Sequence, residues 1–142
     1  MVVAVIGLGL IGGSAALDLK ARGFTNKIIG LEKDSDYARL ALKRGIADVL
    51  ANSLEEAVLH ANLVILAVPV KEIIALLPEV LELSGEGRVV MDMGSTKQGI
   101  VSCVSEHRFR SSYVATHPMA GTEFSGPSAA IYNLFDGKVA IV

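Results

Sequence analysis

The sequence predicts a doubly wound α/β fold with a mostly parallel sheet, and three observations carry this prediction. Short runs rich in β-branched residues alternate along the chain with segments of helical periodicity, as in βαβ crossovers. Hydrophobic residues make up 51% of the chain, which is typical of strands buried on both faces of a sheet. The length of 142 residues suits one domain, so residues 1–142 are expected to form a single unit.

The first half of the chain is expected to form three strands, each followed by a helix. Gly23 and Gly45 stand where the first two helices should end, because glycine readily adopts the left-handed backbone found there. Ser35 is expected to cap the second helix, and the capping box Ser53–Glu56 should open the third. In chain order, these strands and helices are predicted over residues 2–6, 10–22, 27–31, 35–44, 47–50 and 53–60.

The second half of the chain continues the alternation. The apolar run Leu63–Val70 is long enough for a central strand, and Pro69 should end it because proline cannot donate to the sheet. A helix is predicted from Val70 onward, and Pro78 is expected to kink or end it. The remaining strands and helix are predicted over residues 88–93, 97–108, 113–116 and 138–142.

Composition excludes several classes of protein. Thirteen Lys and Arg against 15 Asp and Glu give a formal charge of −2, which leaves no basic face for nucleic acid. The apolar residues 1–17 fall short of the roughly 18 to 20 that a membrane span needs, and they lack a basic secretory start. Cys103 is the only cysteine and forms no metal motif, so we expect no disulfide, no bound metal and a cytoplasmic location.

A glycine motif of the form G-x-G-x-x-G joins the first predicted strand to the first predicted helix. Its first glycine permits a tight turn, its second lets the backbone approach a pyrophosphate, and its third lets the helix pack on the strand. The helix N-terminus then stabilises the phosphates. The motif predicts a Rossmann-type dinucleotide site formed by Gly7, Leu8, Gly9, Leu10, Ile11 and Gly12.

The coenzyme preference is predicted from residues after the second and fourth strands. Glu32 ends the second strand, about 20 residues after the motif, where a carboxylate accepts hydrogen bonds from ribose hydroxyls and repels a 2′-phosphate. This favours NAD, although Lys33 beside it is able to attract a 2′-phosphate, which leaves NADP as an alternative. Val68 and Pro69 follow the fourth strand and are expected to pack against the coenzyme.

Two polar stretches follow the fifth and sixth predicted strands. Packing in a hydrophobic core does not explain their polar residues. Ser95 or Thr96 would cap the next helix, or the Ser95 hydroxyl would stand at the mouth of the crevice near a catalytic group. Lys97 lies at the wrong end of that helix for the dipole, so it is either a solvated lysine, the more common case, or the partner of a ligand or an acidic neighbour. His117 is the histidine at the carboxyl edge of a strand, and we expect it to carry chemistry.

Together these stretches resemble the cofactor domain of the prephenate dehydrogenase family, of which arogenate dehydrogenases are close relatives. The resemblance implies NAD-dependent oxidative decarboxylation of prephenate to 4-hydroxyphenylpyruvate in tyrosine biosynthesis, with hydride passing to NAD as CO2 leaves. The matching stretches are Gly7–Ser14, Glu32, Ala67–Pro69, Gly94–Lys97 and His117–Gly126.

The same resemblance assigns roles to individual residues. It makes His117 the group that hydrogen-bonds the ring hydroxyl of prephenate and accepts its proton, so activity is expected to rise with pH as the imidazole loses its charge. Ser95 would bond to His117 and to the nicotinamide side. Gly121, Thr122 and Glu123 would form the substrate side of the pocket, with Glu123 ordering its rim. Residue 124 is Phe, where the family more often has a polar or cationic side chain.

The resemblance also implies a further helical domain after residue 142, which would carry a substrate-binding arginine and form a homodimer. This chain is therefore expected to bind NAD and to be nearly inactive alone. Four alternatives stay open: an arogenate dehydrogenase, a β-hydroxyacid or imine reductase, a non-catalytic NAD-binding module, and a scaffold that binds no dinucleotide.

Overall fold

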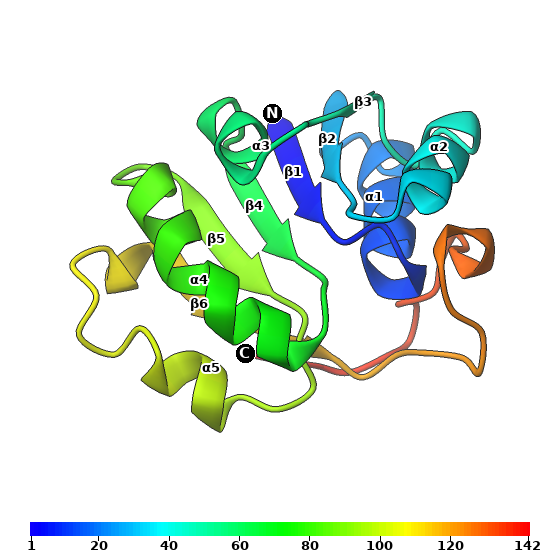
Figure 1. Ribbon diagram of the computed structural model, residues 1–142. Coiled ribbons are helices and arrows are strands. Elements are labelled where there is room, and N and C mark those ends of the chain that lie inside the picture. The colour runs from blue at the N-terminus through cyan, green and yellow to red at the C-terminus, as the bar shows by residue number, and fades with distance from the viewer.

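The computed structural model describes all 142 residues, and a six-stranded parallel sheet forms its centre (Figure 1). The strand order is β3-β2-β1-β4-β5-β6, which confirms the doubly wound fold that the sequence predicts. The order reverses between β1 and β4, so a crevice is expected beyond the carboxyl ends of these two strands. The strands are β1 (Val2–Ile6), β2 (Lys27–Leu31), β3 (Val49–Leu50), β4 (Leu63–Leu66), β5 (Val89–Asp92) and β6 (Tyr113–Ala115).

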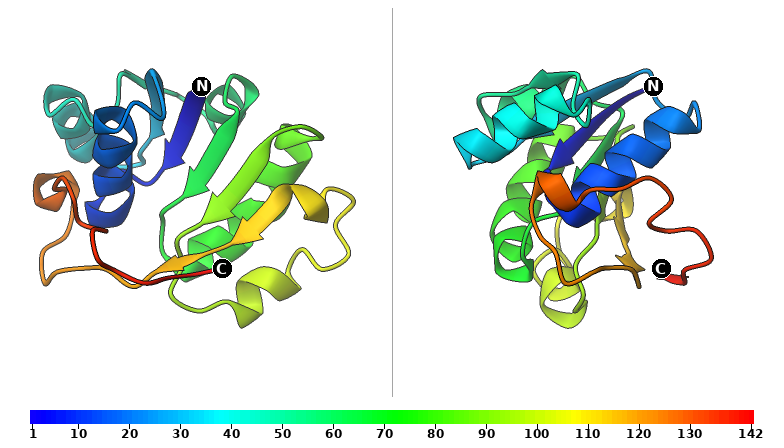
Figure 2. Two further views of the ribbon diagram at one scale, coloured as in Figure 1. Left: turned by 180° about the vertical axis from the view of Figure 1, so that it is seen from behind. Right: turned by 90° about the vertical axis from the view of Figure 1, so that its right-hand side faces the viewer.

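Helices cover the two faces of the sheet unequally. One core joins the sheet to α3, α4 and α5, and the other joins it to α1 and α2. On the α1 side, no helix covers β4, β5 and β6 (Figure 2, left). The helices are α1 (Leu10–Ala21), α2 (Ser35–Lys43), α3 (Leu54–Leu59), α4 (Val70–Ser84) and α5 (Gln98–Ser102), with 3-10 turns η1 (Arg110–Ser112) and η2 (Pro127–Ala129).

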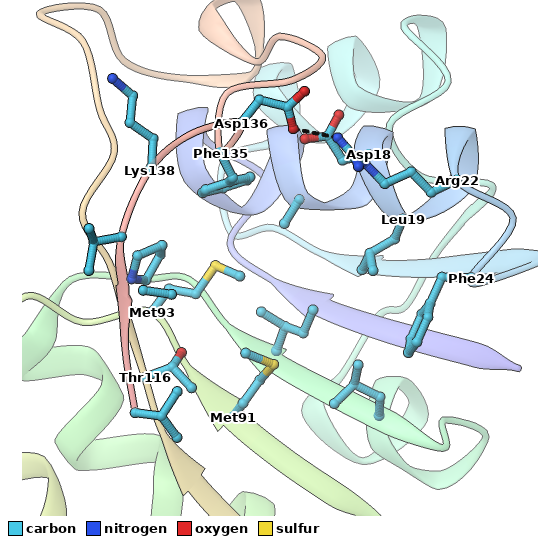
Figure 3. Close-up of a pocket in the computed structure, with 17 residues that line it drawn as sticks. Asp18, Leu19, Arg22, Phe24, Met91, Met93, Thr116, Phe135, Asp136 and Lys138 are labelled. Atoms are coloured by element: carbon cyan, nitrogen blue, oxygen red, sulfur yellow. Dashed lines mark hydrogen bonds and ion pairs between the residues drawn. The ribbon is translucent and has the colours of Figure 1, made fainter.

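An apolar cavity of about 550 Å³ lies against this uncovered part of the sheet (Figure 3). Met91 of β5 and Met93 directly after it line the cavity, together with Phe24 and Phe135. An ion pair between Arg22 and Asp136 closes one end, where it holds the C-terminal segment against α1. Met93 and Pro118 of its lining also border a smaller cavity at the carboxyl ends of the strands, so the two cavities are neighbours.

Two helix boundaries differ from the prediction, because side-chain burial or side-chain capping decides them and local helix propensity does not. α4 does not end at Pro78 but continues to Ser84, because Leu77 before the proline and Val80 and Leu81 after it are buried in the core that packs on the sheet. The cap of α2 is Asp34 instead of Ser35, since the Asp34 carboxylate accepts hydrogen bonds from the backbone N–H groups of residues 36 and 37. Ser53 caps α3 as predicted by accepting a bond from the Glu56 N–H at 3.1 Å.

The remaining corrections concern lengths and the last strand. α5 ends at Ser102, six residues before the predicted end at 108, and the chain continues to η1 in irregular turns. The strand predicted over 138–142 shortens to β8 (Ala140–Ile141), which pairs antiparallel with β7 (His117–Pro118) in a separate two-stranded sheet. None of the helices is long and apolar enough to cross a membrane.

Candidate active site

The turn after β1 carries the glycine motif, and its packing requires two of the glycines. Gly7 has φ of +92°, and a Cβ on it would lie 2.6 Å from the carbonyl oxygen of Ala67. A Cβ on Gly12 would lie 2.0 Å from the carbonyl oxygen of Gly7. Any larger residue at either position would therefore force the turn, α1 and the chain after β4 apart.

The second glycine of the motif and the start of α1 form an open cradle. A Cβ on Gly9 would meet no atom within 4 Å, so packing does not account for this glycine. α1 begins at Leu10 without a side-chain cap and without an acidic residue in its first turn. Its first backbone N–H groups are free to bind an anion, which the helix dipole favours. This set of donors fits the pyrophosphate of a dinucleotide.

Glu32 lies beside this cradle. One carboxylate oxygen accepts a hydrogen bond from the Leu8 N–H at 3.0 Å, and the other accepts one from the Asp34 N–H at 3.1 Å. The Leu8 side chain is fully buried against Gly30, so Leu8 reaches the site through its backbone alone. The carboxylate is thus held at the end of β2, close to the glycine turn, as an acceptor suited to ribose hydroxyls.

A cavity of about 380 Å³ connects the glycine turn to the end of β2. We call it the coenzyme cavity. Tyr37 of α2 and Glu72 of α4 also line it, and neither was predicted, because no motif in the sequence marks the first turns of these helices as part of the site. The predicted site residues that line it are Gly7, Gly9, Glu32, Lys33, Val68 and Pro69.

A second cavity, of about 250 Å³, lies beyond the ends of β5 and β6. We call it the histidine cavity. Ser95 and His117, predicted from separate motifs, both line it, and so does Ile11 of the glycine motif. No hydrogen bond joins Ser95 to His117, so the bond expected between them stays a prediction. Leu10 lines neither cavity.

The two cavities share a wall. Ala67, Val68 and Pro69, which link β4 to α4, line both of them. β4 is one of the two strands at the switch point of the sheet, so this turn stands where a doubly wound fold places its ligand. An extended ligand that bound in the coenzyme cavity could therefore reach the histidine cavity across this wall.

A buried carboxylate lies beneath the histidine cavity. Asp92, the last residue of β5, is fully buried and forms an ion pair with Lys97. It also accepts hydrogen bonds from the Gly94 N–H at 2.8 Å, from the Tyr113 hydroxyl at 2.6 Å and from the Thr116 N–H at 3.3 Å. Burial, followed by the hydrogen bond to Asp92, raises the pKa of Tyr113 well above its ordinary value, so its hydroxyl remains a donor.

This cluster connects the two segments that carry Ser95 and His117. Lys97 donates a further hydrogen bond to the carbonyl oxygen of Thr116 at 2.6 Å, directly before His117. Asp92 meanwhile holds the N–H of Gly94, directly before Ser95. The unfavourable position of Lys97 at a helix start was the one sequence signal for an acidic neighbour, and the structure identifies that neighbour as Asp92.

The residues predicted for the substrate side lie outside both cavities. Gly121, Thr122 and Glu123 are exposed and line neither of them. The Thr122 hydroxyl accepts a hydrogen bond from the Phe124 N–H at 3.2 Å, which makes this segment a local turn. Their contact with a substrate remains a prediction.

Comparison with known proteins agrees with the geometry. Residues 15–142 match the family model described as "Prephenate dehydrogenase, nucleotide-binding domain". The chain belongs to the prephenate dehydrogenase family. The prephenate dehydrogenase of Bacillus subtilis (strain 168) is 37% identical over 142 residues, which cover 99% of this chain and 38% of that protein. The chain thus spans about two fifths of the length of this relative.

Solved structures of prephenate dehydrogenase relatives share the fold over nearly the whole chain. The crystal structure of Synechocystis arogenate dehydrogenase is 30% identical and superposes with a TM-score of 0.87, over 99% of this chain and 49% of that one. Prephenate dehydrogenase from A. aeolicus, crystallised with hydroxyphenyl propionate and NAD+, is 29% identical with a TM-score of 0.82, again over 99% of this chain and 49% of that one.

Proposed function

We propose that this chain binds NAD and forms the coenzyme-binding part of an enzyme that oxidatively decarboxylates prephenate. The observation that carries the proposal is the shared wall of residues 67–69, which joins the coenzyme cavity to the cavity lined by Ser95 and His117. A dinucleotide with its pyrophosphate at the start of α1 and its adenosine ribose at Glu32 would extend along this wall toward His117. The NAD+ complex of the A. aeolicus relative supports this choice of coenzyme.

Each group of the site would then have a chemical task. NAD, when bound, supplies the acceptor for the hydride that leaves the hydroxyl-bearing ring carbon of prephenate. The neutral His117 imidazole accepts the hydroxyl proton, and the resulting carbonyl-like centre draws electrons from the bond to the departing CO2. Aromatisation of the ring makes the step irreversible. Ser95 fixes the orientation of the imidazole, and the apolar Ile11 and Val68 exclude water from the reacting carbon.

The substrate carboxylates need cations that this chain does not place in the histidine cavity. No Lys or Arg lines that cavity, whereas prephenate carries two carboxylates, which arginines bind most specifically. We therefore propose that polypeptide beyond residue 142 supplies the substrate-binding arginine and the dimer contact. The chain alone would bind NAD with little turnover.

Prephenate is proposed over arogenate because the Bacillus subtilis relative is a prephenate dehydrogenase. The test is NADH absorbance after addition of each substrate to protein extended to the length of its relatives. We expect turnover with prephenate. Equal or faster turnover with arogenate would select the arogenate dehydrogenase alternative, which the Synechocystis relative represents.

Coenzyme binding has its own test in two neighbouring glycines. Gly9→Ala places a methyl group in the open cradle, so we expect NAD+ affinity to fall at least about tenfold, with about 1 kcal/mol or less lost from the free energy of unfolding. Gly12→Ala should instead destabilise the fold by about 3 kcal/mol or more, because its methyl group would overlap the Gly7 carbonyl. Calorimetric titration and urea unfolding measure the two quantities. If NAD+ affinity were unchanged in Gly9→Ala, the pyrophosphate would not bind at the start of α1.

A further inference from the structure

Two cations surround the carboxylate that is proposed to bind the adenosine ribose. Lys33 lines the coenzyme cavity together with Glu32, and both also line a neighbouring cavity of about 630 Å³. Arg39 of α2 lines that neighbouring cavity as well. NADP differs from NAD by a 2′-phosphate on this ribose. A cation beside the ribose that is free of other partners would bind that phosphate.

Both cations are already paired with acidic side chains. The Lys33 ammonium lies 2.6 Å from a Glu72 carboxylate oxygen, and Arg39 forms an ion pair with Asp36 one turn away on α2. The hydrogen bond from Lys33 to Glu72, followed by the charge of that carboxylate, raises the pKa of Lys33. Among the charged groups that line these two cavities, no cation is left without an acidic partner.

We infer that Glu72 is a coenzyme-selectivity residue, which holds Lys33 in an ion pair across the coenzyme cavity and so favours NAD over NADP. The inference rests on the proposed binding of the dinucleotide. It assigns to Glu72 a role that Glu32 alone does not fill, because Glu32 repels a 2′-phosphate while Glu72 removes the cation that would attract it.

The position of Glu72 suits this role. It lies in the first turn of α4, where the helix dipole favours a negative charge. A 2′-phosphate would have to draw Lys33 away and would leave Glu72 unpaired close to a second anion. Both side chains reach solvent, with Lys33 78% and Glu72 37% exposed, so the effect is a moderate preference and weakens as salt increases.

The test is direct titration of the 142-residue chain with NAD+ and with NADP+, which requires no turnover. Glu72→Gln frees Lys33 while preserving side-chain shape, so we expect NADP+ affinity to rise about five- to tenfold. NAD+ affinity is titrated in parallel, and the ratio of NADP+ affinity to NAD+ affinity should rise. In the double variant Lys33→Met with Glu72→Gln, the gain should vanish, because the released cation is no longer present.

Glu79→Gln is the matched control. Glu79 is an exposed glutamate on the same helix, it lines neither cavity, and its replacement removes the same charge. We expect it to leave both affinities unchanged. An equal gain in Glu79→Gln would attribute the effect to overall charge and overturn the inference.

The remaining outcomes separate the inference from the proposed function. NADP+ affinity that stays within twofold in Glu72→Gln, or a gain that persists without Lys33, would overturn the role of Glu72 while dinucleotide binding stands. The role of Glu72 would also be overturned if the wild-type chain bound NADP+ as tightly as NAD+. A wild-type chain that binds neither coenzyme would overturn the inference and the proposed function together.

Discussion

Replacement of His117 by asparagine is expected to lower kcat about 100- to 10,000-fold, the usual contribution of a positioned general base. Asparagine retains a polar side chain that can hydrogen-bond the substrate hydroxyl, but it cannot accept the hydroxyl proton. His117 lies in β7, outside the coenzyme cavity, so NAD+ affinity should remain nearly that of the wild type. The loss should therefore appear in turnover and not in coenzyme binding.

The measurement is NADH formation from prephenate in protein extended to the length of its relatives, alongside NAD+ titration. His60→Asn is the matched control, because His60 is exposed at the end of α3 and lines neither cavity. A kcat within a factor of a few of the wild-type value would exclude His117 as the base.

Lys97→Met is expected to lower the free energy of unfolding by about 3 kcal/mol. The substitution keeps most of the aliphatic length but leaves the fully buried Asp92 carboxylate without its cation. It also removes the hydrogen bond to the Thr116 carbonyl, so the segments that carry Ser95 and His117 lose their common anchor. Turnover should fall together with stability.

Urea unfolding of the 142-residue chain measures the stability change. Lys71→Met is the control, since Lys71 is exposed on the first turn of α4 and forms no ion pair. It should change the free energy of unfolding by less than about 0.5 kcal/mol. A similarly small loss in Lys97→Met would mean that the ion pair between Lys97 and Asp92 does not stabilise the fold.

The sheet and the glycine turn could be predicted because their signals are local. A β-branched run followed by spaced glycines specifies a strand, a turn and a helix start within a dozen residues. The edge shared by Ser95 and His117 followed from a topological rule, since all parallel strands end on the same side of the sheet. The rule placed Ser95 and His117 at one edge, but it did not place Gly121, Thr122 and Glu123, which line neither cavity.

The polar connections could not be predicted, because they join residues that are distant in sequence. Tyr113 and Asp92 meet only because β5 and β6 are neighbours, and Lys33 meets Glu72 only because α4 begins beside the end of β2. A helix end at Pro78 was wrong for a related reason, since tertiary burial of α4 carries the helix through this residue, and the kink that was the other expectation stays a prediction.

The single turn of chain between β4 and α4 has a consequence for engineering. Because Ala67, Val68 and Pro69 line both cavities, a substitution there would alter the fit of the proposed coenzyme and the proposed substrate at once. Variants selected at this turn for a new substrate should display epistasis with changes at Glu32, whereas variants at Ser95, which faces one cavity, should combine additively with them. A redesign of coenzyme preference should therefore begin at residues outside the wall that the two cavities share.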